Sequence, residues 1–201
     1  MIDVYKYSKK NLVYNLFFNK LIGIDTKVFS KQFFHKDSID LGFNETFFYN
    51  YFNDTPITKW GGSANTRDHY QSNHNLEKLI EFKKPIKILE KILNDKIKHQ
   101  MFKKKTIGKF KIKNIWFTIK KNNDKHSIHN HPKSVLSGVY YFKIDENSGG
   151  ELNLHLEDKD LSLNCKKNDL VIFNSNMFHS VKPYYGQNDR ISIAWDAIYT
   201  F

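Results

Sequence analysis

Three histidines in a shared local pattern are the residues of this chain best suited to bind a metal ion. His129 and His131 are separated by one residue and followed by Pro132, which keeps this stretch out of a helix. Alternate side chains of an extended segment point to the same side, so these two imidazoles should converge. His179 comes fifty residues after His129, behind an apolar run and a short polar turn. We therefore predict one metal site formed by His129, His131 and His179, with coordination positions left open for small ligands.

Two hydrophobic periodicities describe the elements that must position these histidines. Between residues 75 and 101, apolar residues recur every three or four positions, which predicts an amphipathic helix capped by Asn73 or Asn75. Pro85 lies inside this run, so we expect either two helices or one kinked helix. After residue 105 the period switches to two. Short strands separated by polar turns, typical of a β-sandwich or barrel, are predicted at residues 109–120, 135–144, 152–156, 170–173 and 191–198.

These elements predict a single domain over residues 1–201 that is mainly β with a helical N-terminal half (α+β). Residues 1–105 would form a mostly helical support region. Residues 106–201 would form a double-stranded β-helix, of the jelly-roll or cupin-like kind, as the catalytic core. We expect residues 11–18 to be a strand or a short helix, and the aromatic-rich residues 33–52 to form short helices and loops packed on this core. The glycine-bearing segment 60–67 is interpreted as a connector, with a lid over the site as the alternative.

The composition indicates a folded, basic protein. The chain has a net charge of +11 and is 40% hydrophobic. Among its 32 basic residues only Arg67 and Arg190 are arginine, and the lysines are spread along the chain. We therefore interpret the charge as a solvated surface, with a nucleic-acid partner as the less favoured alternative. The single cysteine, Cys165, is expected to be a small buried side chain and suits a reducing compartment. The chain has no long apolar run, and its first residues do not resemble a signal peptide. Together with the single cysteine, this predicts a cytoplasmic protein without a membrane span.

The order of motifs in the C-terminal half resembles the Fe(II)/2-oxoglutarate-dependent oxygenases, especially their prolyl-hydroxylase-like branch. It is most similar to bacterial and phage members that carry an H-x-H-P motif before S-G-V-Y-Y. The resemblance covers about residues 110–198 and rests on His129 to Pro132, Ser137 to Phe142, Gly149 to Leu152, Leu170 to Phe173, His179 to Pro183, Gly186 and Arg190 to Ser192. The family pattern has a carboxylate two residues after the first histidine, where this chain has His131.

The resemblance implies a dioxygenase, expected to be a hydroxylase, that uses Fe(II), 2-oxoglutarate and O2. It assigns His129 and His179 to the metal, and His131 occupies the position of the third ligand. It also implies that Arg190 binds the distal carboxylate of 2-oxoglutarate through two parallel hydrogen bonds, with Ser192, Tyr141 and Ser137 on the cosubstrate side. For the third ligand, the alternatives are that His131 only lines the pocket, or that Asp124 or Glu151 completes the metal site.

Two other functions are compatible with the same residues. The first is a cupin-like three-histidine metalloprotein that does not use 2-oxoglutarate, although the glutamate that a cupin motif places shortly after its histidine pair is absent after His131. The second is a basic binding module on a catalytically dead scaffold. Neither the prime substrate nor the oligomeric state is specified by the residues, and a protein side chain, a free amino acid, a nucleobase or a small metabolite would all be compatible.

Overall fold

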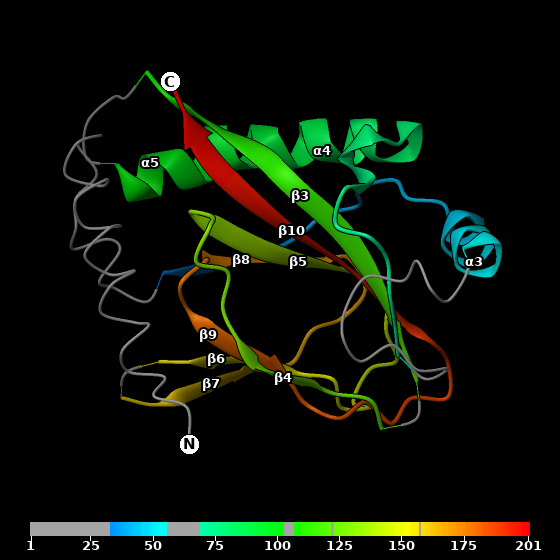
Figure 1. Cartoon of the computed structure of the whole chain (residues 1–201). Coiled ribbons are helices and arrows are strands. Elements are labelled where there is room, and N and C mark those ends of the chain that lie inside the picture. The colour runs from blue at the N-terminus through cyan, green and yellow to red at the C-terminus, as the bar shows by residue number, and fades with distance from the viewer. Residues whose placement is uncertain (1–32, 56–68, 103–106, 122, 157) are drawn as a thin grey trace.

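The protein is built around two antiparallel β-sheets that face each other (Figure 1). This computed structural model describes residues 33–55, 69–102, 107–121, 123–156 and 158–201. The expected segments at residues 11–18 and 60–67 lie outside the described residues. In the described part of the chain, no helix combines the length and apolarity needed to span a membrane.

The larger sheet has six strands, and its centre is formed by long strands that are buried on both faces. In spatial order the strands are β1 (Phe34–Ser38), β8 (Asp169–Asn174), β5 (Leu136–Lys143), β10 (Arg190–Thr200), β3 (Lys109–Lys120) and β2 (His69–Gln71). Tyr140 packs toward the helices, whereas its neighbour Tyr141 packs toward the second sheet. A strand with two buried faces reads as a nearly continuous apolar run, which is how β5 and β8 appear in the sequence.

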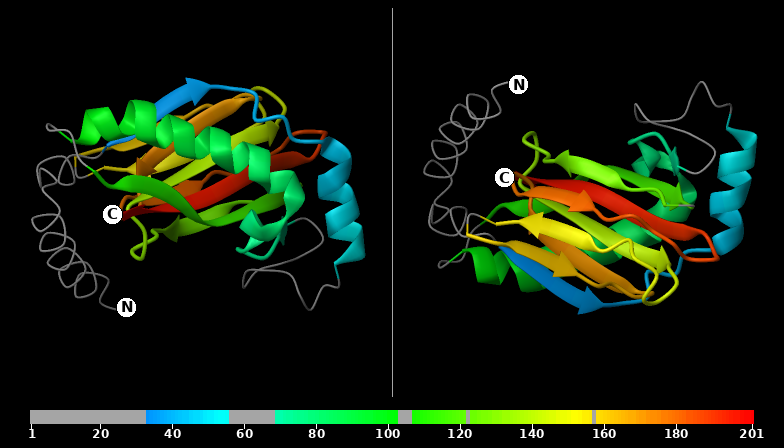
Figure 2. Two further views of the ribbon diagram at one scale, coloured as in Figure 1. Left: turned by 90° about the horizontal axis from the view of Figure 1, so that it is seen from above. Right: turned by 90° about the horizontal axis from the view of Figure 1, so that it is seen from below.

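The smaller sheet has four strands and covers part of the inner face of the larger one (Figure 2). Its order is β4 (His126–His129), β9 (Phe178–Val181), β6 (Leu152–His155) and β7 (Asp160–Leu163). A small core that includes Leu154, Phe173 and Met177 fills the space between the sheets. Cys165 belongs to this core, which confirms the prediction of a small buried side chain.

Helices cover the outer face of the six-stranded sheet (Figures 1 and 2). They are α4 (Ile80–Ile92) and α5 (Lys98–Met101), with a 3₁₀ turn at Leu76–Lys78 and a π-helical turn at Leu93–Ile97, and α3 (Glu45–Asp54) lies at one end of the sheet. The main hydrophobic core lies between these helices and the sheet, and includes Phe82, Leu89, Phe117 and Ile193. This burial, rather than helix propensity, supplies most of the stabilisation of a helix in a folded domain.

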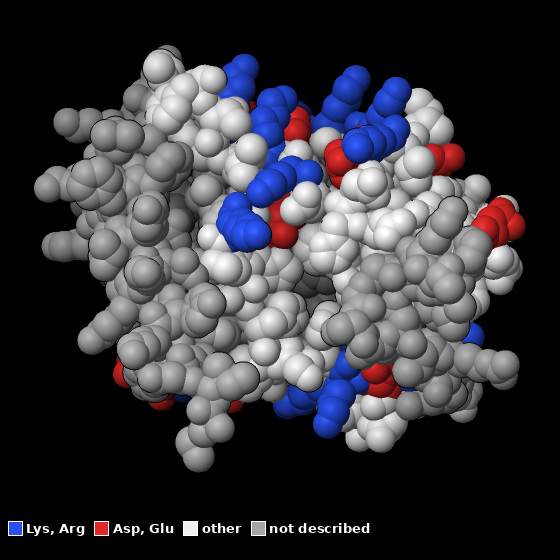
Figure 3. All heavy atoms as spheres, viewed as in Figure 1, with Lys and Arg blue, Asp and Glu red and all other residues white. Residues whose placement is uncertain are grey.

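The helix that the sequence predicted is present, but its irregularity lies elsewhere than expected. α4 runs through Pro85, which is buried, and the chain departs from α-helical geometry at Leu93–Ile97 instead. Asn75 precedes the 3₁₀ turn without making a side-chain capping bond. The solvent-facing side of this helical region carries lysines interspersed with acidic residues (Figure 3). Lys91 Nζ, for example, lies 2.6 Å from the Asp95 carboxylate.

The predicted double-stranded β-helix is confirmed, and the strands expected at 109–120, 135–144, 152–156, 170–173 and 191–198 are all present within about two residues of their predicted ends. The N-terminal half contributes more than helices. β1 pairs with β8 and β2 pairs with β3, so both edges of the larger sheet come from residues before 105.

Candidate metal centre and anion pocket

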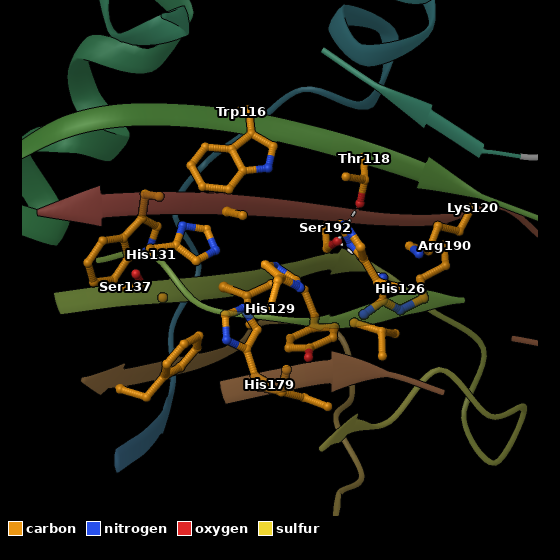
Figure 4. A pocket seen from close by; sticks show the side chains of 18 residues that line it. Trp116, Thr118, Lys120, His126, His129, His131, Ser137, His179, Arg190 and Ser192 are labelled. Carbon is orange, nitrogen blue, oxygen red and sulfur yellow. Dashed lines mark hydrogen bonds between the residues drawn. The ribbon is translucent and has the colours of Figure 1, made fainter. Parts of the chain in front are cut away.

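A pocket between the two sheets collects most of the side chains that the sequence singled out (Figure 4). Its floor is the inner face of β3, β10 and β5, and its opposite wall comes from the smaller sheet. The polar residues that line it are Thr118, Lys120, His126, His129, His131, Ser137, Tyr141, His179, Arg190 and Ser192.

Three histidines converge at one end of this pocket. His129 ends β4 and lies directly opposite His179 of β9 in the strand register. His131 lies in the turn after β4, where its backbone N–H donates to the Ser175 carbonyl over 2.7 Å. One ring nitrogen from each of the three histidines lies within 4.8 Å of the other two, a spacing that allows them to share one metal ion.

Hydrogen bonds fix the orientation of the two histidines from the smaller sheet. His129 Nδ1 is 2.7 Å from the carbonyl of Ser127, and His179 Nδ1 is 3.0 Å from the carbonyl of Met177. A carbonyl can only accept, so Nδ1 carries the proton and Nε2 keeps a free lone pair. Both rings are therefore held in the tautomer that offers Nε2 to a metal.

The electrostatic surroundings keep these imidazoles neutral. Burial, helped by the neighbouring His129, lowers the pKa of His179 to about 3. Burial likewise lowers the pKa of His129. Since a neutral imidazole is the form that binds metals, protons compete weakly for these nitrogens at neutral pH.

The third histidine, His131, contacts a buried carboxylate, that of Asp196, which the sequence analysis missed. His131 Nδ1 lies 3.0 Å from Oδ1 of Asp196, and Ser137 Oγ donates to the same oxygen over 2.6 Å. Asp196 is 5% exposed. A carboxylate that accepts from Nδ1 orients a metal-binding histidine and raises its basicity. Among the described residues, the cluster of potential metal ligands consists of the three histidines and contains no carboxylate. Asp124, one of the alternative third ligands, pairs with Lys120 instead.

Replacing Asp196 by asparagine should weaken Fe(II) binding by roughly 10- to 100-fold, the usual effect of losing such a supporting carboxylate. Anaerobic titration with Fe(II) measures this affinity. Ser137→Ala is the matched control, and it should have a smaller effect because it removes one hydrogen bond and leaves the carboxylate in place. If Asp196→Asn binds Fe(II) like the parent protein, Asp196 does not support a metal ligand.

The other end of the pocket is built by cross-strand pairs on the floor. Arg190 lies opposite Lys120, and Ser192 lies between Thr118 and Tyr141 in the strand register. Directly paired residues project from the same face of a sheet, so all five side chains point into the pocket. Thr118 Oγ1 and Ser192 Oγ are 2.8 Å apart.

Arg190 is buried, and contacts with neighbouring side chains hold it in place. It is 1% exposed, its Nη1 donates to Ser192 Oγ over 3.2 Å, and its guanidinium carbon lies 5.0 Å from the centre of the Tyr141 ring. Gly150, at a φ of +73°, packs so closely that a Cβ there would lie 3.1 Å from Arg190 Cδ and Nε. Gly150 of the sequence motif therefore makes room for this arginine, whereas its neighbour Gly149 approaches the Pro183 carbonyl.

Unsatisfied polar atoms make this end of the pocket a candidate anion site. Within the described part of the chain, Arg190 Nε and Tyr141 Oη make no hydrogen bond of normal geometry. Buried donors in native proteins are almost always paired, so a ligand that accepts hydrogen bonds is expected here. Burial also raises the pKa of Tyr141 well above its usual value, which keeps the hydroxyl protonated as a donor.

The predicted residues thus fall into two groups. His129, His131 and His179 meet at the metal end, and Arg190, Ser192 and Tyr141 meet at the anion end. The structure places Ser137 beside the His131–Asp196 pair rather than beside Arg190. Lys120 and Thr118, which the sequence analysis did not single out, belong to the anion end, and Asp196 belongs to the metal end.

The fold and the site together place the protein among the double-stranded β-helix proteins with a histidine-lined pocket. Residues 114–168 match the model of the family described as "Putative 2OG-Fe(II) oxygenase". No curated protein sequence matches the chain significantly.

Solved structures with the same fold include prolyl hydroxylases. A prolyl-4-hydroxylase from Pseudomonas putida superposes with a TM-score of 0.58 at 12% identity, covering 86% of this chain and 96% of the other. The viral collagen prolyl hydroxylase of Paramecium Bursaria Chlorella virus-1, solved as a 2-oxoglutarate complex, gives 0.59 at 16% identity, with coverages of 84% and 97%. A prolyl hydroxylase from Trichoplax adhaerens gives 0.59 at 15% identity, with coverages of 98% and 94%. The resemblance seen in the motifs is therefore confirmed, by the family model over residues 114–168 and by these structures for the fold.

Proposed function

We propose that this protein is an Fe(II)- and 2-oxoglutarate-dependent dioxygenase, and specifically a hydroxylase of an organic substrate. The observation that carries the proposal is that a three-histidine cluster and a buried arginine whose Nε has no hydrogen-bond partner line one pocket. A metal-chelating acid with a distal carboxylate is a ligand that fits both ends at once. The family match and the shared fold support the same class of ligand.

Each group of residues has a distinct task in this proposal. His129, His131 and His179 hold Fe(II), and Asp196 orients His131 through Nδ1. Arg190 binds the distal carboxylate of 2-oxoglutarate through paired donors. Together with O2, the bound iron and 2-oxoglutarate supply an oxidant for a substrate C–H bond, with succinate and CO2 as the products of the cosubstrate.

The remaining lining of the pocket is suited to exclude water. Val139, Leu152, Phe173 and Val181 come from both sheets and line the pocket together with the histidines and Arg190. Trp116 stacks against the His131 ring, with 5.6 Å between ring centres and 12° between planes. A dry, preorganised surrounding strengthens the electrostatic interactions of a bound carboxylate and protects the oxidant from side reactions.

Anaerobic titration of the protein with Fe(II) and then with 2-oxoglutarate tests the proposal. The expected result is the weak visible charge-transfer band of the iron chelate, saturating with 2-oxoglutarate. Admission of O2 and a suitable substrate should then yield succinate. Absence of both the band and any 2-oxoglutarate binding would contradict the proposed function.

A three-histidine metalloprotein that does not use 2-oxoglutarate is the second candidate, and the lack of a carboxylate in the described ligand group favours it specifically. It predicts Fe(II) binding with no response to 2-oxoglutarate, whereas a catalytically dead binding module predicts no Fe(II) binding. Neither alternative accounts for the two buried cations, Arg190 and Lys120, that line the pocket.

Tyr141→Phe should weaken 2-oxoglutarate binding by roughly 1–2 kcal/mol, the scale of one hydrogen bond to a charged group. The ring would still pack under Arg190, so the fold and the metal site should be preserved. Calorimetric titration of the Fe(II)-loaded protein measures the change. Equal affinities for the two proteins would show that the Tyr141 hydroxyl does not touch the cosubstrate.

A further inference from the structure

We propose that Lys120 is a second cationic binding residue for the distal carboxylate of the cosubstrate, so that the pocket selects 2-oxo dicarboxylates over 2-oxo monocarboxylates. This inference rests on the proposed function and extends it to a residue outside the motifs that the sequence analysis used.

The first observation is the position of Lys120. It ends β3 directly opposite Arg190, and cross-strand partners project from the same face of the sheet. Its side chain lines the pocket next to Arg190 (Figure 4). Both residues are 1% exposed, although lysine is almost never fully buried without an anionic partner.

The second observation is an imbalance of charge. Lys120 Nζ lies 3.1 Å from Oδ2 of Asp124, whose side chain is 17% exposed. In the part of the chain that the structure describes, Asp124 is the carboxylate that pairs with Lys120, and the cross-strand neighbour of Lys120 is a second buried cation, Arg190. Like charges in a low-dielectric site repel each other strongly, and a bound carboxylate would restore the balance.

The protonation state of Lys120 is compatible with this role. Burial lowers its pKa to about 8, against the opposing effect of Asp124, and Arg190 contributes to the lowering. Lys120 is thus mainly charged at neutral pH. A carboxylate placed between Lys120 and Arg190 would stabilise the charged form further.

The neighbouring donors complete a site for one carboxylate group. Thr118, Ser192 and Tyr141 contribute hydroxyl groups from the same face of the sheet, and the Ser192 hydroxyl accepts a hydrogen bond from Arg190 Nη1. An acid without a distal carboxylate would leave two buried cations, Lys120 and Arg190, beside the Asp124 carboxylate without the added anion. Discrimination against such ligands therefore follows from the cost of an unpaired buried charge.

The test compares Lys120→Met with the parent protein for binding of two ligands, by calorimetry on the anaerobic Fe(II)-loaded proteins. 2-Oxoglutarate carries the distal carboxylate, and pyruvate keeps the 2-oxo acid end without it. We expect the substitution to lower 2-oxoglutarate affinity by roughly 10- to 100-fold, the scale of a charge-assisted hydrogen bond. Pyruvate affinity should stay unchanged, and Lys120→Arg should recover part of the 2-oxoglutarate affinity.

Lys121→Met is the matched control, because it makes the same chemical change one residue further along, at a side chain that is 44% exposed and paired with Asp189. It should bind 2-oxoglutarate like the parent protein. Equal 2-oxoglutarate affinity for Lys120→Met and the parent protein overturns the inference while leaving the proposed function intact. An equal loss for both ligands in Lys120→Met also overturns it, since a folding or metal defect would explain that pattern. Failure of the parent protein to bind 2-oxoglutarate overturns the proposed function and this inference together.

Discussion

Arg190→Met should abolish 2-oxoglutarate binding at concentrations that saturate the parent protein, while Fe(II) still binds. The ligand carboxylate would lose its fixed bidentate partner in a site that excludes water, which costs roughly 3–5 kcal/mol. Such a loss makes the complex with 2-oxoglutarate weaker by more than about 100-fold. Calorimetric titration with 2-oxoglutarate, after Fe(II) loading in the absence of O2, measures it.

Arg190→Lys is the informative companion to this variant. It keeps the positive charge but lacks the planar fork and the stacking on Tyr141, so its affinity should fall between those of the parent protein and Arg190→Met. If Arg190→Met binds 2-oxoglutarate as tightly as the parent protein, the assignment of this end of the pocket to the cosubstrate is wrong.

His131→Ala should lose Fe(II) as completely as His129→Ala does. One ring nitrogen from each histidine lies within 4.8 Å of the other two, so each histidine would supply one ligand to a shared metal ion. Removal of a ligand should exceed the effect of removing its supporting carboxylate, which gives an expected loss of more than about 100-fold in metal affinity. Anaerobic Fe(II) titration of the two variants side by side measures this.

His155→Ala is the control for a histidine on the same sheet that is not a ligand. His155 bonds to Asp160 and Ser180 instead of joining the cluster, so this variant should keep its iron. A His131→Ala protein that retains Fe(II) and turns over 2-oxoglutarate would contradict the three-histidine site and place the third ligand elsewhere.

Local patterns were enough to predict the parts of the fold that bury a regular stripe of side chains. The helix over residues 75–101 and the strands at 109–120 and 191–198 carry such stripes, and each is present. Arg190 and the three histidines were singled out by their order in a family's motifs, and the structure brings them into one pocket. Short strands such as β1 and β7 escaped prediction, since three to five residues hold too little periodicity.

The missed site residues have two different causes, and for Lys120 the cause is the register of β3. β3 has a bulge at Lys113, opposite Asp196 and Ala197 of β10. Side chains therefore alternate between the two faces of the sheet in one phase before Lys113 and in the opposite phase after it. Simple alternation would place Lys120 with the apolar residues and give no hint that it faces Arg190. Asp196 was missed because its partner, His131, lies 65 residues away in the sequence, and the chain folding back is what brings the two together.

The most direct test of the three-histidine centre is a crystal structure of the protein loaded with Fe(II) and 2-oxoglutarate in the absence of O2, with the metal located by its anomalous scattering. We expect ring nitrogens of His129, His131 and His179 at a ligation distance of about 2.1 Å from the metal, as in other metal–imidazole sites, and the distal carboxylate at Arg190. A metal more than about 3 Å from His131, or one coordinated by a protein carboxylate in its place, would contradict this account.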